Sequence, residues 1–283
     1  MLTDTHAHLD FPEFQTDFKD VLARADAAGV KRILTIGTSV ESSRRAVALA
    51  ERLPNIHAVI GVHPTAAIET GEDAMEQLRQ LAQSPRVVAI GETGLDYHRL
   101  PSGEVALDPE HLALGGGSTV ELEASIKDGA YKSAQAVLFQ QQLDLAVELG
   151  LNVVIHQRDA WSDTLQILGG YTGKLRAVYH CFGNTFEEAE SLFALGHLIS
   201  FTGIVTFKNA PLVHEAARKV PSERYMVETD CPYLAPVPFR GKRCEPAHTL
   251  QVAEEIARLR GETLAQVAET TERNAENFFR FAR

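Results

Sequence analysis

Leu2-Thr3-Asp4-Thr5-His6-Ala7-His8 opens the chain as a short β-branched stretch, and the amphipathic stretch Phe14–Ala28 follows it. The same alternation continues along the chain. Strands are expected at Leu2–His8, Arg32–Gly37, His57–Gly61, Val87–Gly91, Asn152–His156, Arg176–His180, Leu198–Phe201 and Tyr225–Glu228. Helices are expected at Phe14–Ala28, Ser39–Arg52, Asp73–Gln83, Ser133–Leu149, Ala160–Leu168, Phe186–Leu195, Pro211–Lys219, Pro246–Arg258 and Thr263–Phe281. Eight strand–helix units predict an α/β fold with parallel strands, and eight is the number that closes a (β/α)8 TIM barrel.

The length of 283 residues fits one such barrel, so we expect a single domain over residues 1–283. A doubly wound open sheet is the alternative, but it normally carries a GxGxxG or P-loop motif in an early turn, and the sequence has neither. An insertion is expected at about 98–134, after the fourth strand, because prolines and Gly115-Gly116-Gly117 interrupt the alternation there. Its acidic balance is compatible with a mobile surface insertion or with a lid.

Composition limits the classes of partner. A net charge of −11 disfavours a protein that coats nucleic acid, although an enzyme with a small, local footprint remains compatible with it. No apolar run reaches the ~20 residues that span a bilayer, and no signal peptide is expected. The 3 cysteines show no CxxC spacing, which favours a reducing cytoplasm over a disulfide framework. We therefore expect a cytoplasmic protein without membrane partners, and a monomer.

Metal-ligating residue types gather where the expected strands end, the edge of a barrel at which chemistry collects. These residues are His6, His8, His63, Glu92, His156, His180 and Asp230. His6 and His8 are two residues apart on one strand, so their side chains share a face and can ligate one ion. A lone histidine is more often a hydrogen-bonded core residue, but so many at strand ends predict a metal centre.

Several ordered motifs resemble the TatD family of metal-dependent deoxyribonucleases over nearly the whole chain. They are Asp4-Thr5-His6-Ala7-His8-Leu9-Asp10, Gly61-Val62-His63-Pro64, Ile90-Gly91-Glu92-Thr93-Gly94-Leu95-Asp96, Val154-Ile155-His156-Gln157-Arg158-Asp159-Ala160, His180-Cys181-Phe182-Gly183, Ser200-Phe201-Thr202-Gly203 and Glu228-Thr229-Asp230-Cys231-Pro232-Tyr233-Leu234. Arg240-Gly241-Lys242-Arg243 with Glu245-Pro246 continues the likeness, but Cys244 stands where the family pattern usually has Asn.

This resemblance implies a site for two divalent metal ions. His6, His8 and Asp230 would hold one ion, His156 and His180 the other, and Glu92 would bridge both. Two such ions polarise a phosphoryl oxygen and activate water. Mixed histidine and carboxylate ligation suits Zn²⁺ or Mn²⁺, whereas the family is usually described as Mg²⁺-dependent. Glu92 and Asp230 are the expected catalytic residues, and Asp230 has a second candidate role as proton acceptor.

Contacts to substrate are expected from His63, Arg158 and Lys208. Arg158 suits a phosphate because its guanidinium can form two parallel hydrogen bonds, but a structural ion pair with Asp159 is an equal alternative. Lys208, Arg240 and Arg243 are candidates for positive charge at the mouth, and equally for solvated charges or loop contacts.

The implied function is a phosphodiesterase that hydrolyses DNA, with RNA left open, from the 3′ end of single strands. The alternative is a carboxylic ester or amide hydrolase, such as a lactonase, an aminoacyl-tRNA deacylase or an amidohydrolase. Many of those related barrels carry a carboxylated Lys where this chain has Glu92, which favours the nuclease. A metal-bound scaffold without catalysis is disfavoured, because every expected ligand is present.

Overall fold

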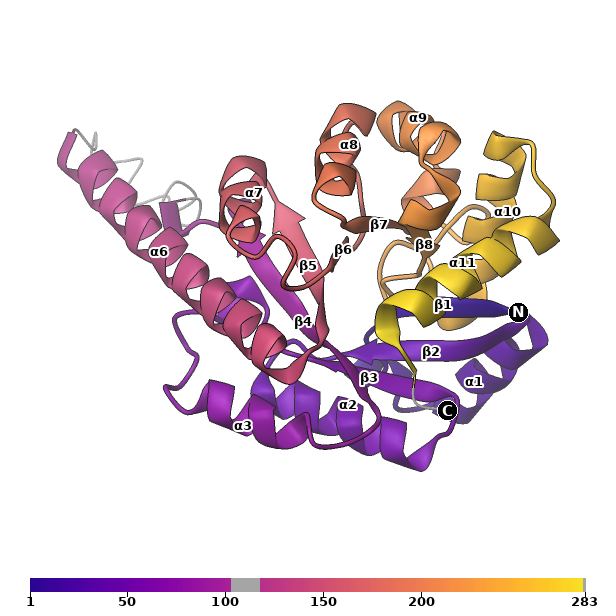
Figure 1. Cartoon of the computed structure of the whole chain (residues 1–283), viewed down its shortest axis with the longest axis horizontal. Helices are drawn as coiled ribbons and strands as arrows, with labels where there is room; N and C mark the ends of the chain where they lie inside the picture. Colours follow the sequence, from indigo (N-terminus) through magenta and orange to yellow (C-terminus); the bar gives the residue numbers. More distant parts are fainter. Residues whose placement is uncertain (103–117, 282–283) are drawn as a thin grey trace.

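Parallel strands form the centre of the computed structural model, which describes residues 1–102 and 118–281 (Figure 1). One 8-stranded sheet runs in the order β1 to β8. The strands are β1 (Leu2–Ala7), β2 (Val30–Ile36), β3 (Ile56–Ile60), β4 (Val87–Asp96), β5 (Asn152–Arg158), β6 (Ala177–Tyr179), β7 (Leu198–Phe201) and β8 (Tyr225–Val227). A parallel bridge between Ala7 and Cys231 joins the first strand to the segment after the last one. The predicted barrel is confirmed.

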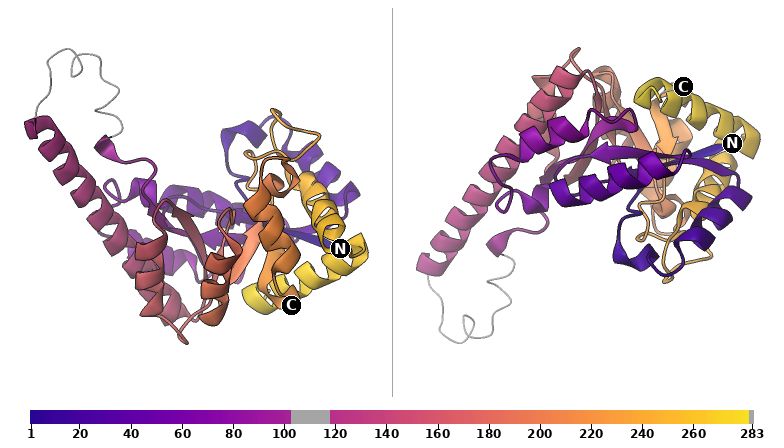
Figure 2. Two further views of the ribbon diagram at one scale, coloured as in Figure 1. Left: turned by 90° about the horizontal axis from the view of Figure 1, so that it is seen from above. Right: turned by 90° about the horizontal axis from the view of Figure 1, so that it is seen from below.

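Helices lie outside the strands (Figure 2). They are α1 (Phe18–Ala27), α2 (Val40–Arg52), α3 (Ala74–Leu81), α6 (Ser118–Leu149), α7 (Trp161–Gly169), α8 (Phe186–Ala194), α9 (Pro211–Lys219), α10 (Thr249–Arg260) and α11 (Leu264–Phe279). Strand side chains alternate between two cores, because successive residues of a strand point to opposite faces. One face packs against the helices, while Leu34, Val154 and Val178 belong to a separate cluster that Phe278 and Phe279 of α11 join.

The fourth strand is longer than expected and ends at Asp96 rather than Gly91, so that Glu92 lies within it. Glycines flank Glu92 for a steric reason. At Gly94, with φ of +145°, a Cβ atom would lie 1.9 Å from the carbonyl oxygen of His156, and at Gly91 it would lie 2.6 Å from that of Val154. The two glycines therefore let β4 lie against β5 where the site forms.

The predicted start of the helix before β5 was wrong. α6 begins at Ser118, not at Ser133, and projects from the barrel (Figures 1 and 2). Strong helix formers such as Ala124, Lys127 and Ala130 extend it backward into the predicted insertion. Residues 103–117 of that insertion lie outside the described residues.

Two buried glutamines tie α6 to the carboxyl end of the barrel. Gln135 accepts a hydrogen bond from the Asp96 amide at 2.8 Å and donates one to the Asp96 carbonyl at 3.0 Å. Gln142 bonds in the same way to both backbone groups of Val62 and donates to Thr93 at 2.8 Å. The long helix thereby holds the end of β4 in place.

Two other boundaries differ because short 3₁₀ turns replace the first helical turn. Pro12–Phe14 forms such a turn before α1, and Pro246–His248 forms another before α10. Across the described residues, no helix is both long enough and apolar enough to cross a membrane.

Candidate metal centre

All six predicted metal ligands converge at the carboxyl end of the barrel. Three belong to strands (His6 in β1, Glu92 in β4 and His156 in β5), His8 and His180 directly follow strands, and Asp230 lies shortly after β8. Each is buried or half-buried. His156 and His180 continue the inward-facing series that begins with Val154 and Val178, since residues two apart on a strand share a face. The barrel architecture thus gathers residues that are far apart in sequence.

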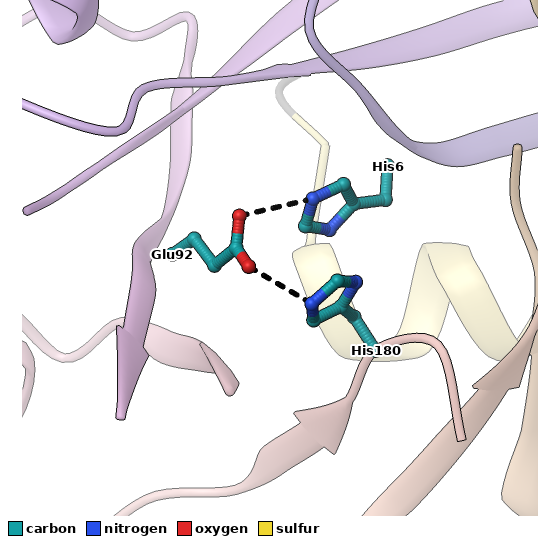
Figure 3. A group of neighbouring side chains, drawn as sticks. All are labelled: His6, Glu92 and His180. Carbon is teal, nitrogen blue, oxygen red and sulfur yellow. Dashed lines mark ion pairs between the residues drawn. The ribbon is translucent and has the colours of Figure 1, made fainter. Parts of the chain in front are cut away.

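Glu92 faces four histidines, which form two adjacent groups according to the carboxylate oxygen nearest to them. Figure 3 shows one histidine of each group, His6 and His180, whose rings stack with a centroid separation of 4.1 Å while each faces a different oxygen. Oε2 lies 3.3 Å from His6 Nε2 and 3.8 Å from His8 Nε2. Oε1 lies 2.9 Å from His180 Nε2 and 2.8 Å from His156 Nδ1. This arrangement suits a bridging carboxylate, because each oxygen can serve a different ion.

Asp230 completes the first of these groups. Its Oδ1 lies 3.4 Å from His8 Nε2 and 3.6 Å from His6 Nε2. The residue has a φ of 58°, in the left-handed region that aspartate tolerates better than most side chains. Its amide donates to the His6 carbonyl at 2.8 Å, so the unusual backbone is fixed directly against β1.

The donor set fits divalent cations. His6 Nε2 is buried and forms no hydrogen bond with any described residue, although it points at two carboxylates. A buried polar atom without a partner is costly, and a cation would accept its lone pair. Potential ligand atoms of His6, His8 and Asp230 lie within 4.8 Å of one another, as do those of His6, Glu92 and His180. Nitrogen and oxygen donors at this spacing are typical of Zn²⁺ or Mn²⁺ sites.

Electrostatics keep the carboxylates ionised. Burial alone would raise the pKa of Glu92, but the neighbouring His180 and His6 hold it well below its usual value. Burial also opposes the charged form of Asp230, yet the hydrogen bond from His8 and the nearby His6 lower its pKa. Burial disfavours protonated His180, but Glu92 and Glu228 raise its pKa well above normal. Cations and protons therefore compete for this centre.

A family model described as "TatD related DNase" matches residues 3–280. The chain belongs to this family. A relative from Bacillus subtilis (strain 168), named "Uncharacterized metal-dependent hydrolase YabD", is 37% identical over 281 residues, 99% of each chain. A "3'-5' ssDNA/RNA exonuclease TatD" from Citrobacter rodentium is 34% identical and covers 98% of this chain and 97% of its own. The crystal structure of YJJV, a TatD homolog from Escherichia coli K12, superposes with a TM-score of 0.83 at 27% identity, covering 99% and 98%.

In this TatD-family chain, several candidate ligands have a second partner that sequence reasoning missed. His180 Nδ1 lies 3.5 Å from Glu228, which also accepts a hydrogen bond from Ser200 and one of 2.7 Å from the Cys181 amide. His156 Nε2 lies 3.2 Å from Asp96. Such partners orient imidazole rings and raise their basicity toward a metal. A signal existed, since Asp96 and Glu228 stand inside the quoted motifs, but nothing in the sequence showed which histidine each would face.

Of the three predicted substrate contacts in this TatD-family chain, two line a cavity at the metal centre and one does not. His63 and Arg158 line a cavity of about 860 Å³ that opens on the metal centre, together with Arg99. His63 Nε2 lies 3.6 Å from Glu92. Arg158 is exposed and forms no ion pair with Asp159 or any other described residue. Lys208 is exposed and is not among the described residues lining this cavity.

Two further arginines are held by local contacts. Arg243 pairs with Asp17 at 2.7 Å, and the Arg240 guanidinium stacks on the Phe207 ring at 3.7 Å. Both contacts match the loop contacts that were expected as the alternative to a substrate role for these two residues.

Proposed function

We propose that this chain is a metal-dependent phosphodiesterase that removes nucleotides from the 3′ end of single-stranded DNA, with RNA as a further candidate substrate. The observation that carries the proposal is Glu92, whose two oxygens face different histidines at 2.8–3.8 Å, Oε2 toward His6 and His8 and Oε1 toward His156 and His180. Two divalent ions would be held by His6, His8 and Asp230 on one side, by His156 and His180 on the other, and by Glu92 between them. Family membership and the exonuclease name of one relative support the same reaction.

Divalent ions bound here would polarise the phosphoryl oxygen and lower the pKa of water. Glu92 and Asp230 would have different tasks around these ions. Glu92 is almost fully buried and stays ionised, so its task is to hold charge in a fixed position. The Asp230 side chain retains 15% exposure and lines the cavity, so it is placed to accept a proton from an attacking water.

The mouth of the cavity combines aromatic rings with cations. Phe11 stacks on His8 with a 4.7 Å centroid separation, and Tyr233 meets Phe11 edge-on while remaining 52% exposed. Exposed rings of this kind can stack on nucleobases. Arg158 and Arg99 line the same cavity and would bind phosphate oxygens, despite the acidic balance of the whole chain.

Cavity size favours a chain end over a continuous duplex. A volume of about 860 Å³ is within the range of sites that hold one small ligand, and it can accommodate a terminal nucleotide. A long basic track, which a duplex-binding protein would need, is not expected at a net charge of −11. We therefore favour exonucleolytic cleavage.

The test compares substrates on one metal-reconstituted preparation. Single-stranded DNA labelled at either end, the matching RNA, and a panel of lactones and amides are incubated after chelation and after return of Mg²⁺, Mn²⁺ or Zn²⁺. We expect metal-restored, stepwise release of nucleotides from the 3′ end. Ester or amide turnover without any DNA or RNA cleavage would instead support the carboxylic hydrolase, and chelator-resistant cleavage by metal-free protein would contradict both.

A further inference from the structure

A second large cavity lies at the amino end of the barrel, opposite the metal centre. It has a volume of about 770 Å³ and lies between the segments that begin β5 to β8 and the last helix, α11. Its volume is in the range of small-molecule sites. None of its lining residues belongs to the metal centre or to the cavity above it.

Positive charge dominates the lining of this amino-end cavity. The cationic residues are Lys174, Arg176, Arg224, Arg273 and Arg280, and the only acidic residue among the described lining is Glu223. None of the five cations forms an ion pair with a described residue. This concentration is notable in a chain whose net charge is −11.

Two of these cations, Arg224 and Arg280, lie near enough to Arg176 to repel it. Arg176 and Arg224 are half-buried, and burial together with the nearby Arg224 and Arg280 lowers the pKa of Arg176. Lys174 donates a hydrogen bond to the Gly170 carbonyl at 3.1 Å, and Arg176 donates one to the Gly196 carbonyl at 3.3 Å, but these neutral acceptors leave the positive charges uncompensated. A bound anion would relieve the remaining repulsion.

Buried amides hold the cavity walls rigidly. Asn274 donates hydrogen bonds to the carbonyls of Ser222 at 2.7 Å and Tyr225 at 2.8 Å, which joins α11 to the start of β8. Asn152 donates to the Phe278 carbonyl at 2.6 Å and accepts from the Arg176 amide at 3.1 Å. The cationic side chains therefore project from a fixed frame, which lowers the entropic cost of ligand binding.

We propose that the amino-end cavity binds a small phosphorylated ligand that carries at least two negative charges. Guanidinium groups match phosphate oxygens by paired hydrogen bonds, and four arginines line this cavity. A cavity of about 770 Å³ suits a compact ligand, whereas a long nucleic acid would need an extended basic stripe. The proposal does not rest on the nuclease activity.

The experiment is calorimetric titration of the full-length, metal-loaded protein with AMP and, separately, with inorganic pyrophosphate at constant ionic strength. Arg224→Gln and Arg273→Gln should each weaken binding about tenfold, which corresponds to one charge-assisted hydrogen bond. The matched control is Arg44→Gln, which removes the same charge from the exposed face of α2 and should leave binding unchanged. Lys174→Gln, at an exposed position, provides a second variant in which misfolding is not expected.

The outcomes separate this site from the metal centre. Glu92→Gln should leave the arginine-dependent binding intact, and AMP or pyrophosphate at one fixed concentration should raise the melting temperature of the wild type more than that of Arg224→Gln. The proposal is overturned if neither ligand binds, or if Arg224→Gln, Arg273→Gln and Lys174→Gln bind as the wild type does. It is also overturned if a single-stranded oligonucleotide, but neither small phosphate, depends on these three residues.

Discussion

Each end of the barrel carries a buried glutamate, and the two carboxylates differ in their partners. At the amino end, Glu272 accepts a hydrogen bond of 2.6 Å from Thr3 and pairs with Arg32, and the Asn152 and Asn274 amides bond to backbone carbonyls. At the carboxyl end, His6 Nε2 has no hydrogen bond although two carboxylates lie within 3.6 Å. Satisfied groups stabilise a fold, whereas an incomplete cluster requires a ligand. Buried atoms without a partner also occur at the amino end, at His57 Nδ1 and His197 Nε2, but these two are affected by burial and nearby arginines rather than by carboxylates.

The largest expected effect is that of Glu92→Gln, which removes the negative charge that His6, His8, His156 and His180 all face. We expect nuclease turnover to fall roughly 10³-fold, because the centre loses the carboxylate best placed to bridge cations. Steady-state kinetics with labelled single-stranded DNA and calorimetric metal titration measure the change. Unaltered turnover in a metal-saturated sample would disprove the bridging role.

The matched control lies at the other end of the barrel. Glu272→Gln makes the same chemical change in a buried carboxylate whose partners are Thr3 and Arg32. We expect about 2 kcal/mol less free energy of unfolding and unchanged turnover. If Glu272→Gln lowered turnover as Glu92→Gln does, the contrast between the two ends would fail.

A smaller effect is expected from Glu228→Gln, because Glu228 contacts a candidate ligand rather than the cations themselves. Its carboxylate lies 3.5 Å from His180 Nδ1. Loss of such a partner should weaken metal binding about 10–100-fold while turnover at saturating metal is largely retained. Metal affinity and turnover are measured on the same preparation. A loss of turnover that added metal cannot restore would place Glu228 directly in the chemistry.

Arg158→Gln tests the substrate side of the carboxyl end. We expect kcat/KM for DNA to fall about tenfold and ester turnover, if present, to stay unchanged, because the guanidinium is proposed to bind phosphate. Lys208→Gln is the control, since Lys208 is equally exposed but does not line the cavity. Equal losses for DNA and ester with Arg158→Gln would instead show a structural role.

Sequence reasoning succeeded where chemistry follows the strand period and failed where it depends on packing. The alternation of strands and helices predicts the barrel, and the strand-end positions of His6, His8, His156 and His180 predict that they meet. The orientation of the histidine rings was not predictable from the sequence. It depends on contacts with Glu228 and Asp96, and the sequence does not show which histidine each carboxylate will face. The need for glycine at 94 was equally hidden, since it comes from the His156 carbonyl of a strand far along the chain.

The smallest expected effect concerns His57, an amino-end histidine in β3 that packs on Phe281 with a centroid separation of 4.6 Å. Burial, reinforced by Arg86 and Arg32, lowers the pKa of His57 to about 3. In the unfolded chain, His57 is protonated below about pH 6.5, whereas in the folded chain it stays neutral down to about pH 3. The free energy of unfolding therefore falls progressively as the pH is lowered from 6.5 toward 3. His57→Phe should remove about 2 kcal/mol of the stability difference between pH 7 and pH 5, measured by urea unfolding of both proteins. An identical pH dependence in the variant would mean that His57 titrates normally, and that the amino end contains a solvated histidine rather than a buried neutral one.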